Sequence, residues 1–123
     1  MMTKQQFFDE AYGTRPPENY ERFFVPVIGE PVARDLIRLA AVQAGERVLD
    51  VACGTGIVAR LAAQQVGSEG SVTGLDMNPG MLAVARSAAP PELSIEWHQA
   101  SADDMPLPDE AFDVVTAVVL GEL

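Results

Sequence analysis

One short segment constrains the fold of this chain more than any other: an apolar strand that ends on an acid and then turns through two glycines. The segment reads Val48-Leu49-Asp50-Val51-Ala52-Cys53-Gly54-Thr55-Gly56, and residues 57–66 continue it as a predicted helix. Glycines let the backbone approach a ligand closely, and a helix N-terminus presents unpaired N–H groups. A strand, a glycine turn and a helix in this order are typical of a nucleotide-binding corner in a parallel α/β sheet.

A second acid lies where such a corner needs one. Asp76 follows Gly56 by twenty residues and ends the next apolar run. An acid at this distance, at the tip of the second strand, is placed to accept hydrogen bonds from a ribose. The two features together predict a site for a nucleoside-bearing ligand.

Two such ligands fit the glycine spacing. Gly54-x-Gly56-x-x-Ala59 satisfies the dinucleotide pattern, so NAD is one candidate. A dinucleotide lays its anionic pyrophosphate on the glycine turn, where the Asp50 carboxylate would repel it. S-adenosylmethionine (SAM) has no phosphate and carries a positive ammonium and sulfonium, which Asp50 would attract. The alternative is that Asp50 merely caps the turn.

The remaining segments predict an α/β fold, with a Rossmann-like parallel sheet, helices on both faces and strand order 3-2-1-4. The expected strands cover residues 47–52, 71–75, 93–99 and 112–120, and the expected helices cover residues 31–43, 56–66 and 79–89. The last strand is a nearly continuous apolar run, which is typical of a strand buried on both faces. Residues 1–29 are expected to be irregular or loosely helical, with a short helix over 19–24.

Composition narrows the function. The chain has 123 residues, enough for one small domain, and a net charge of −10. This charge argues against a nucleic-acid binder, which normally carries a basic patch, and against an anionic membrane surface. Cys53 is the single cysteine, which fits a reducing cytoplasm. Neither a signal peptide nor an apolar run long enough to span a membrane is expected. His98 is the only histidine, so no metal site is predicted.

With these residues in place, the chain resembles the class I SAM-dependent methyltransferases, and in particular the branch of the ubiquinone and menaquinone biosynthesis enzymes. Four segments carry the resemblance: the glycine motif at residues 48–56, the second-strand motif Gly74-Leu75-Asp76-Met77-Asn78-Pro79-Gly80-Met81-Leu82, the segment Trp97 to Ala102, and Met105-Pro106-Leu107-Pro108 followed by Phe112-Asp113-Val114-Val115. The resemblance implies a SAM-dependent methyl transfer to a small-molecule acceptor. It also implies SAM, or its product S-adenosylhomocysteine, as the cofactor.

The resemblance also implies roles for the glycine motif. Asp50 and the backbone around Ala52 would hold the methionine ammonium. Gly54 and Gly56 would let the cofactor lie on the turn beside Cys53. No residue is identified as catalytic, because methyl transfer is a direct displacement that needs alignment rather than a protein nucleophile.

Further roles follow from the second and third strands. Asp76 would accept from both ribose hydroxyls, and Met77 would pack on the adenine face. Ser101 stands where the family often has an aspartate that accepts from the adenine amino group, and a hydroxyl is the weaker acceptor by about 1 kcal/mol. Ala102 would offer its backbone N–H to the adenine ring. Asp103 is a possible substitute for the missing aspartate.

The resemblance implies two parts for the chain. Residues 1–29 would form a lid-like segment, to which Tyr20 and Phe24 would belong, with packing on a surface helix as the alternative for this pair. Residues 30–123 would form the SAM-binding domain. The family sheet has seven strands, so a chain that stops after the fourth is expected to be truncated to the cofactor-binding part. A non-catalytic SAM-binding remnant or an oligomeric fold is therefore an alternative function, and a NAD-binding domain is a lower one.

The end of the chain carries one further expectation. The fourth strand would lack its neighbour and would expose the apolar side chains of Val114, Val115, Val118, Val119 and Leu120. An exposed apolar edge strand is a template for pairing. The sequence therefore predicts a homo-oligomer that forms through this strand.

Overall fold

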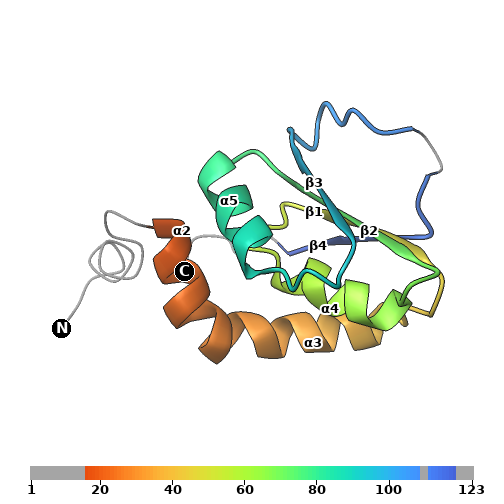
Figure 1. The fold of residues 1–123 in the computed structure, drawn as a ribbon, viewed down its shortest axis with the longest axis horizontal. Helices are drawn as coiled ribbons and strands as arrows, with labels where there is room; N and C mark the ends of the chain where they lie inside the picture. Colours follow the sequence, from red (N-terminus) through yellow and green to blue (C-terminus); the bar gives the residue numbers. More distant parts are fainter. Residues whose placement is uncertain (1–15, 109–110, 119–123) are drawn as a thin grey trace.

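The computed structural model, which describes residues 16–108 and 111–118, contains a four-stranded parallel sheet (Figure 1). Its strands are β1 (Arg47–Val51), β2 (Ser71–Asp76), β3 (Ile95–Gln99) and β4 (Val114–Ala117). The order is β3-β2-β1-β4, and every pairing is parallel, with Asp50 opposite Gly74 on one side and Thr116 on the other. The predicted Rossmann-like α/β fold and strand order are confirmed.

The two helices that connect these strands pack on one face of the sheet. They are α4 (Ile57–Val66) and α5 (Pro79–Ala88). Trp97 and Ala85 both approach the position of a side chain at Gly56, which places α5 on the face that α4 covers. The steps from β1 to β2 and from β2 to β3 run in the same direction, so right-handed crossovers put both helices on the same side. The two crossover helices therefore lie on one face, and Leu49, Thr73 and Leu75, which point to the other face, are buried as well.

The main hydrophobic core lies between α4 and this face. Valine side chains of β1 and β2 alternate toward the helix, as the two-residue period of a strand requires. Small residues of α4 let the helix approach the sheet closely. The buried members are Val42, Val48, Ala59, Ala62, Ala63, Val66 and Val72, and Ile95, Trp97 and Val114 pack against them.

Residues 16–39 form one continuous helical run, which includes the short helix predicted over 19–24 and extends well beyond it. The run comprises α2 (Pro16–Asn19), the π-helix η1 (Tyr20–Gly29) and α3 (Glu30–Leu39). Pro26 lies inside η1 and cannot donate a backbone hydrogen bond, a defect that the wider π-turn accommodates. α3 packs beside α4 along the lower edge of Figure 1. It ends before the expected residue 43, and Ala41 adopts a φ of 52°.

The fourth strand is shorter than the predicted 112–120, and residues 119–120 lie outside the described part. Asp113 precedes β4 and joins it to the start of β1, because the carboxylate accepts from the Arg47 backbone and guanidinium at 2.8 to 3.2 Å. Val115 is 62% exposed, so the prediction of a strand buried on both faces is wrong. The reason is that α4 covers only the face toward which Val114 and Thr116 point.

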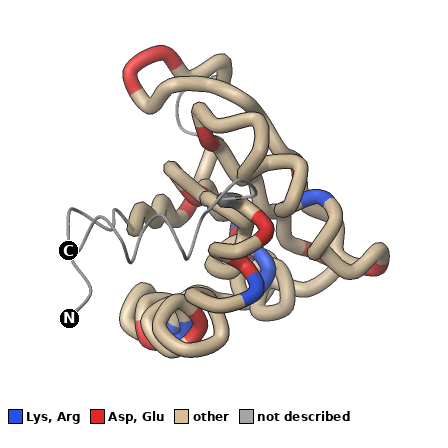
Figure 2. The backbone as a smooth tube through the Cα atoms, turned by 90° about the vertical axis from the view of Figure 1, so that its left-hand side faces the viewer, with Lys and Arg blue, Asp and Glu red and all other residues tan. Residues whose placement is uncertain are grey.

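Charged residues are spread along the described backbone, with acidic positions in the majority (Figure 2). Six arginines lie in the described residues, and four of them are paired with carboxylates: Arg34 with Glu30, Arg38 with Asp35, Arg47 with Asp113 and Arg60 with Glu21. This part of the molecule therefore offers little unpaired positive charge.

Trp97 requires glycine at two neighbouring positions. A Cβ at Gly74 would lie 2.6 Å from two ring carbons of Trp97, and one at Gly56 would lie 2.7 Å from the same ring. Both distances are shorter than van der Waals contact allows. The indole ring therefore occupies the space that two missing side chains leave free.

We expect Gly74→Ala to destabilise the fold by about 1–3 kcal/mol, the usual cost of overpacking a core. Chemical denaturation monitored by circular dichroism measures the free energy of unfolding. The double variant Gly74→Ala/Trp97→Leu should lose less than the sum of the two single variants, because the leucine vacates the contested space. Additive losses would contradict this account of the glycine.

Candidate functional site

The glycine turn between β1 and α4 has the backbone of a ligand cradle. Three of its residues adopt positive φ angles: Ala52 at 56°, Gly54 at 57° and Gly56 at 91°. Such angles are rare for a residue with a side chain, and they cluster at functional sites. Nothing lies within 4 Å of the position of a Cβ at Gly54, so this part of the turn is open. Gly56 immediately precedes α4, whose first N–H groups are available to a ligand.

Asp76 joins the two motifs that the sequence predicted to share a ligand. Its Oδ2 accepts from the Gly54 backbone N–H at 2.8 Å, and its Oδ1 accepts from the Asn78 N–H at 2.8 Å. A carboxylate oxygen has more than one acceptor site, so both oxygens keep capacity for a ligand. The side chain is only partly buried. Asp76 thus fixes the glycine turn against the end of β2 and still faces outward.

Asp50 is buried at the end of β1, with 2% of its surface exposed. Its Oδ1 accepts from the Thr116 hydroxyl at 2.9 Å, whereas its Oδ2 has no hydrogen-bond partner among the described residues. The pKa of this carboxyl is raised to about 7: burial is the main cause, the Thr116 hydrogen bond opposes the rise, and the nearby Asp76 carboxylate adds to it. A buried polar atom without a partner is costly and calls for an explanation, and a ligand donor supplies one.

The second buried side-chain atom without a partner in the described residues is Oγ1 of Thr55. Both atoms therefore lie within the segment from Asp50 to Thr55, which is the predicted ligand turn. Neither Thr55 nor Thr116 was among the predicted site residues. Thr55 stands between the two glycines of the motif, and this position is a signal that the sequence offered. Thr116 is separated from Asp50 by 66 positions, so only the pairing of β1 with β4 reveals it.

A small cavity of about 50 Å³ lies beside Asp50 and the glycine turn. Tyr20 and Ile28 of η1 contribute to its wall, and the ring of Tyr20 stacks on Phe24 with 4.8 Å between centroids. The remaining lining residues are Gly29, Val32, Ala33, Ala52, Cys53, Gly54, Ile57, Val58 and Val118. The wall is apolar apart from Asp50, the Tyr20 and Cys53 side chains and the backbone of the turn.

Arg60 links η1 to the glycine turn. Its guanidinium donates to the Thr55 carbonyl at 2.7 Å and to the Glu21 carboxylate at 2.7 Å. Both charged side chains are mostly buried, with 13% and 20% exposed. A pair with this burial holds its geometry better than a surface ion pair does. Arg60 therefore holds η1 beside the glycine turn, where η1 forms part of the cavity wall.

Cys53 is buried in the turn, and its backbone N–H donates to the Leu75 carbonyl at 2.9 Å. Burial and the carboxylates of Asp50 and Asp76 raise the pKa of the thiol strongly. Desolvation thus disfavours a thiolate here more than the nearby helix N-terminus favours it.

The predicted adenine residues lie at the ends of β2 and β3. Met77 is 68% exposed, and its carbonyl accepts from the Gln99 side chain at 3.4 Å. The Ala100 N–H donates to the Asp76 carbonyl, which brings the two strand ends together. The Ser101 hydroxyl accepts from the Asp103 N–H at 3.2 Å, and Ala102 is exposed in this turn. The structure thus gathers the predicted residues at one edge of the sheet.

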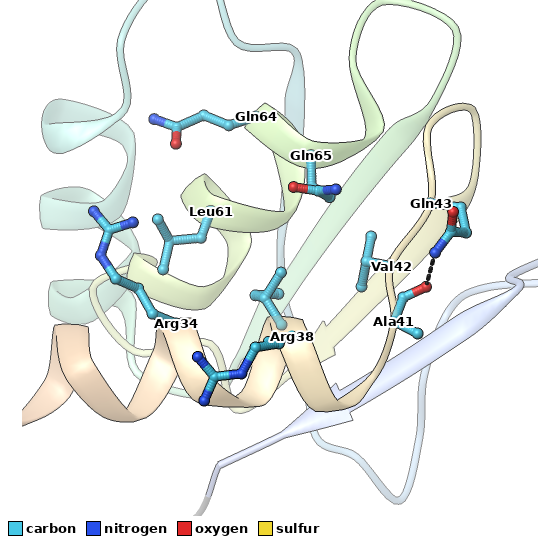
Figure 3. Close-up of a pocket in the computed structure, with 9 residues that line it drawn as sticks. Arg34, Arg38, Ala41, Val42, Gln43, Leu61, Gln64 and Gln65 are labelled. Atoms are coloured by element: carbon cyan, nitrogen blue, oxygen red, sulfur yellow. Dashed lines mark hydrogen bonds between the residues drawn. The ribbon is translucent and has the colours of Figure 1, made fainter.

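A larger pocket of about 520 Å³ lies between α4 and α3, farther along both helices toward their C-terminal ends (Figure 3). Arg34 and Arg38 border it, but each is paired with a carboxylate of its own helix and is largely exposed. Gln43 donates to the Ala41 carbonyl at 2.7 Å, as Figure 3 shows. The chemistry-bearing residues of the glycine turn do not line this pocket.

Residues 48–122 match the family of methyltransferase domains, which is 61% of the chain. The chain belongs to this family of SAM-dependent methyltransferases. The demethylmenaquinone methyltransferase of Symbiobacterium thermophilum is 41% identical over 119 residues, which cover 92% of this chain and 47% of that protein. The chain spans about a third to a half of the length of the curated relatives that it matches.

Solved structures share the fold. A SAM-dependent methyltransferase from Aquifex aeolicus superposes with a TM-score of 0.70 at 22% identity, over 82% of this chain and 55% of that one. An RNA methyltransferase from Salinibacter ruber in complex with S-adenosylhomocysteine gives a TM-score of 0.63 at 24% identity, over 74% of this chain and 59% of that one. At these identities the likeness establishes the fold. The family identifies the cofactor as SAM or S-adenosylhomocysteine.

The residues present fit this cofactor. The unpartnered oxygen of Asp50 suits a cationic donor, and the open turn at Gly54 leaves room for a ligand against the backbone. A pyrophosphate would instead meet the carboxylates of Asp50 and Asp76 at the same turn, without a cation among the residues that line the cavity. Charge therefore favours SAM over a dinucleotide.

The burial of Asp50 predicts how stability depends on pH. Its pKa is about 7 in the folded chain and 3.8 ordinarily, so the folded state holds a proton that the unfolded state releases between these values. The free energy of unfolding should therefore fall as pH rises from 5 to 8. Asp50→Asn cannot ionise and should not show this fall, so its free energy of unfolding should gain about 2–3 kcal/mol relative to the wild type between pH 5 and pH 8. Urea unfolding at each pH measures this, and parallel profiles of the two proteins would contradict it.

Proposed function

We propose that this chain forms the SAM-binding half of a methyltransferase that acts on a small molecule. The observation that carries the proposal is the pair of carboxylates at the glycine turn, one buried with a free oxygen and one bonded to the turn itself. In this assignment Asp50 and the backbone at Ala52 hold the methionine ammonium. Cys53, Gly54 and Gly56 form the surface on which the cofactor lies.

The nucleoside end is assigned to the tips of β2 and β3. Asp76 accepts from the two ribose hydroxyls through the lone pairs that its backbone contacts leave free. Met77 covers one adenine face, and its exposure in the structure leaves that surface available. Ser101 accepts from the adenine amino group, and the Ala102 N–H donates to the ring. The exposed Asp103 is adjacent and can supplement the hydroxyl.

Bound SAM supplies an electrophilic methyl group on its sulfonium. The cavity beside the glycine turn has a largely apolar wall, which includes Ile28, Val32 and Val118. An apolar wall favours an acceptor with an apolar ring, and the Symbiobacterium relative is named for demethylmenaquinone. We therefore propose a quinone-like acceptor. The residues described supply alignment and water exclusion, which are the main requirements of a direct displacement.

The contacts of η1 support the assignment of residues 1–29 as a lid-like segment. Tyr20 lines the cavity from this helix, and Arg60 fastens Glu21 to the carbonyl of Thr55 in the glycine turn. The helix continues into α3 without a break at residue 29. We propose that residues 1–29, of which 1–15 lie outside the described residues, form a lid over the cofactor, and that residues 30–123 form the SAM-binding domain.

Titration calorimetry with SAM, S-adenosylhomocysteine and NAD tests the cofactor assignment. We expect the first two ligands to bind and NAD not to bind. Asp76→Ala should weaken SAM binding by about 1.5–3 kcal/mol, because hydrogen bonds to a charged acceptor are lost. Glu96→Ala, an exposed carboxylate on the neighbouring β3, is the matched control and should leave the dissociation constant unchanged. Tight binding of NAD, or an unaltered constant in the Asp76 variant, would contradict the assignment.

We propose that nucleic acid is not the acceptor. The net charge is −10, and four of the six described arginines are neutralised by carboxylates. RNA binding relies on unpaired cations along the phosphate backbone. The Salinibacter neighbour acts on RNA, but at 24% identity it supports the fold rather than the substrate.

None of the described helices is long and apolar enough to cross a membrane. The unpaired Cys53 supports our proposal of a cytoplasmic location.

We also propose that the outer edge of β4 pairs with a second copy of this chain. Within the described residues, β4 is bonded to β1 alone, and Val115 exposes most of its side chain. Val114 and Val118 are partly buried, whereas Val119 and Leu120 lie outside the described residues. An open edge with an apolar side chain favours such pairing.

We expect the 123-residue chain to be a dimer or larger at micromolar concentration, measured by light scattering after gel filtration. Val115→Lys should shift it to the monomer, because a charge on an edge strand opposes pairing. Leu39→Lys is the control: this leucine is 81% exposed on α3 and should not affect the assembly. A monomeric wild type would overturn the proposal.

A further inference from the structure

We propose that Thr116 is a positioning residue that turns one oxygen of Asp50 toward the cationic amino-acid end of the cofactor, and that cofactor binding is therefore coupled to the ionisation of Asp50. The inference rests on the proposed function, since it concerns the same site. It adds Thr116, which lies outside the glycine motif, to the proposed site, and it predicts that the affinity for the cofactor depends on pH.

The geometry comes from the pairing of β1 with β4. Thr116 lies directly opposite Asp50 in the parallel ladder, so both side chains point to the same face of the sheet. The Thr116 hydroxyl lies 2.9 Å from Asp50 Oδ1 and 3.5 Å from the Leu49 carbonyl. A hydroxyl has a single proton to donate, and the shorter contact assigns it to Asp50. The bond fixes the carboxyl plane and leaves Oδ2 as its free acceptor.

Because Asp50 is buried, its unpaired Oδ2 indicates which kind of ligand group the site requires. Only 2% of the residue is exposed, and the adjoining cavity of about 50 Å³ has room for a small polar group. A carboxylate in such surroundings is stable only with a donor or a cation at its free oxygen. An ammonium group satisfies both conditions. The structure thus contains one half of an ion pair at the place where the glycine turn meets the cavity.

The charged surroundings decide which protonation state the empty site prefers. The titratable groups that face Asp50 are the thiol of Cys53 in the turn, the phenol of Tyr20 on η1 and the carboxylate of Asp76 at the end of β2. α3, α4 and β4 contribute no charged side chain to the lining. Without a cation nearby, burial and Asp76 raise the pKa of Asp50 to about 7. Near neutrality, therefore, a large fraction of the empty sites hold a protonated Asp50.

An ammonium ligand favours the ionised form, so binding below pH 7 must release the proton from Asp50. Affinity should then fall as pH is lowered. For a pKa of about 7, the dissociation constant at pH 6 should be about tenfold larger than at pH 8. Loss of the Thr116 hydrogen bond removes an interaction that lowers the pKa. The midpoint of the pH dependence should therefore move to higher pH.

Two nucleosides and four proteins test this. S-adenosylhomocysteine carries the amino-acid end, whereas 5′-methylthioadenosine keeps the adenosine and the sulfur but lacks that end. Calorimetric titrations of both ligands from pH 5.5 to 9, in buffers of different ionisation enthalpy, give the dissociation constant and the number of protons released. The proteins are the wild type, Thr116→Val, Thr116→Ser and the control Thr73→Val, a buried threonine of β2 that pairs with Leu49 rather than Asp50.

We expect S-adenosylhomocysteine to release close to one proton at pH 6 and almost none at pH 8 from the wild type. Thr116→Val should move the midpoint upward and weaken binding several-fold at pH 7, and Thr116→Ser should restore the wild-type profile. Thr73→Val should keep the wild-type midpoint. 5′-Methylthioadenosine should show a flat profile with every protein, because it lacks the ammonium.

Two other outcomes are distinguishable. If S-adenosylhomocysteine binds with a flat profile, or if Thr116→Val weakens both nucleosides equally without moving the midpoint, the positioning role is overturned and the cofactor assignment stands. If neither nucleoside binds to the wild type, the cofactor assignment itself fails, and this inference fails with it.

Discussion

The site depends on one carboxylate that bridges two strand ends. Asp76 accepts from the backbone of Gly54 on one oxygen and from the backbone of Asn78 on the other, so it closes both the glycine turn and the turn into α5. Asn78 then caps α5 by accepting from the N–H groups of Gly80 and Met81. The parallel sheet brings the carboxyl ends of β1 and β2 to the same edge. A single side chain can therefore organise a turn that lies 22 positions away.

A second consequence of the same arrangement is electrostatic. The turn brings Asp76 close enough to Asp50 to raise the pKa of that buried carboxyl, and only 2% of Asp50 is exposed. A buried acid with a free oxygen destabilises the empty fold once it ionises. The same acid becomes favourable when a cation arrives. The ionised Asp50 therefore lowers the stability of the ligand-free fold and raises its affinity for a cationic ligand.

Part of the fold and of the site was predictable from local patterns in the sequence. The alternating strand and helix periods predicted the parallel sheet and its order, and the glycine spacing with Asp76 predicted which turn and which strand tip would face each other. Three features were not predicted. The helical run through Pro26 depends on a π-turn that packing stabilises, the shared face of α4 and α5 follows from the direction of the crossovers, and the raised pKa of Cys53 follows from burial.

The sequence by itself determined the identity of the family, the sheet and the residues of the glycine turn, because each of these is written in contiguous residues with a fixed period or spacing. The tertiary structure alone decided which groups meet across the chain. Thr116 reaches Asp50 across 66 positions, and Glu21 reaches Arg60 across 39. Such pairs arise from strand register and helix packing. Their energies depend on burial, and burial is a property of the folded molecule rather than of any one segment.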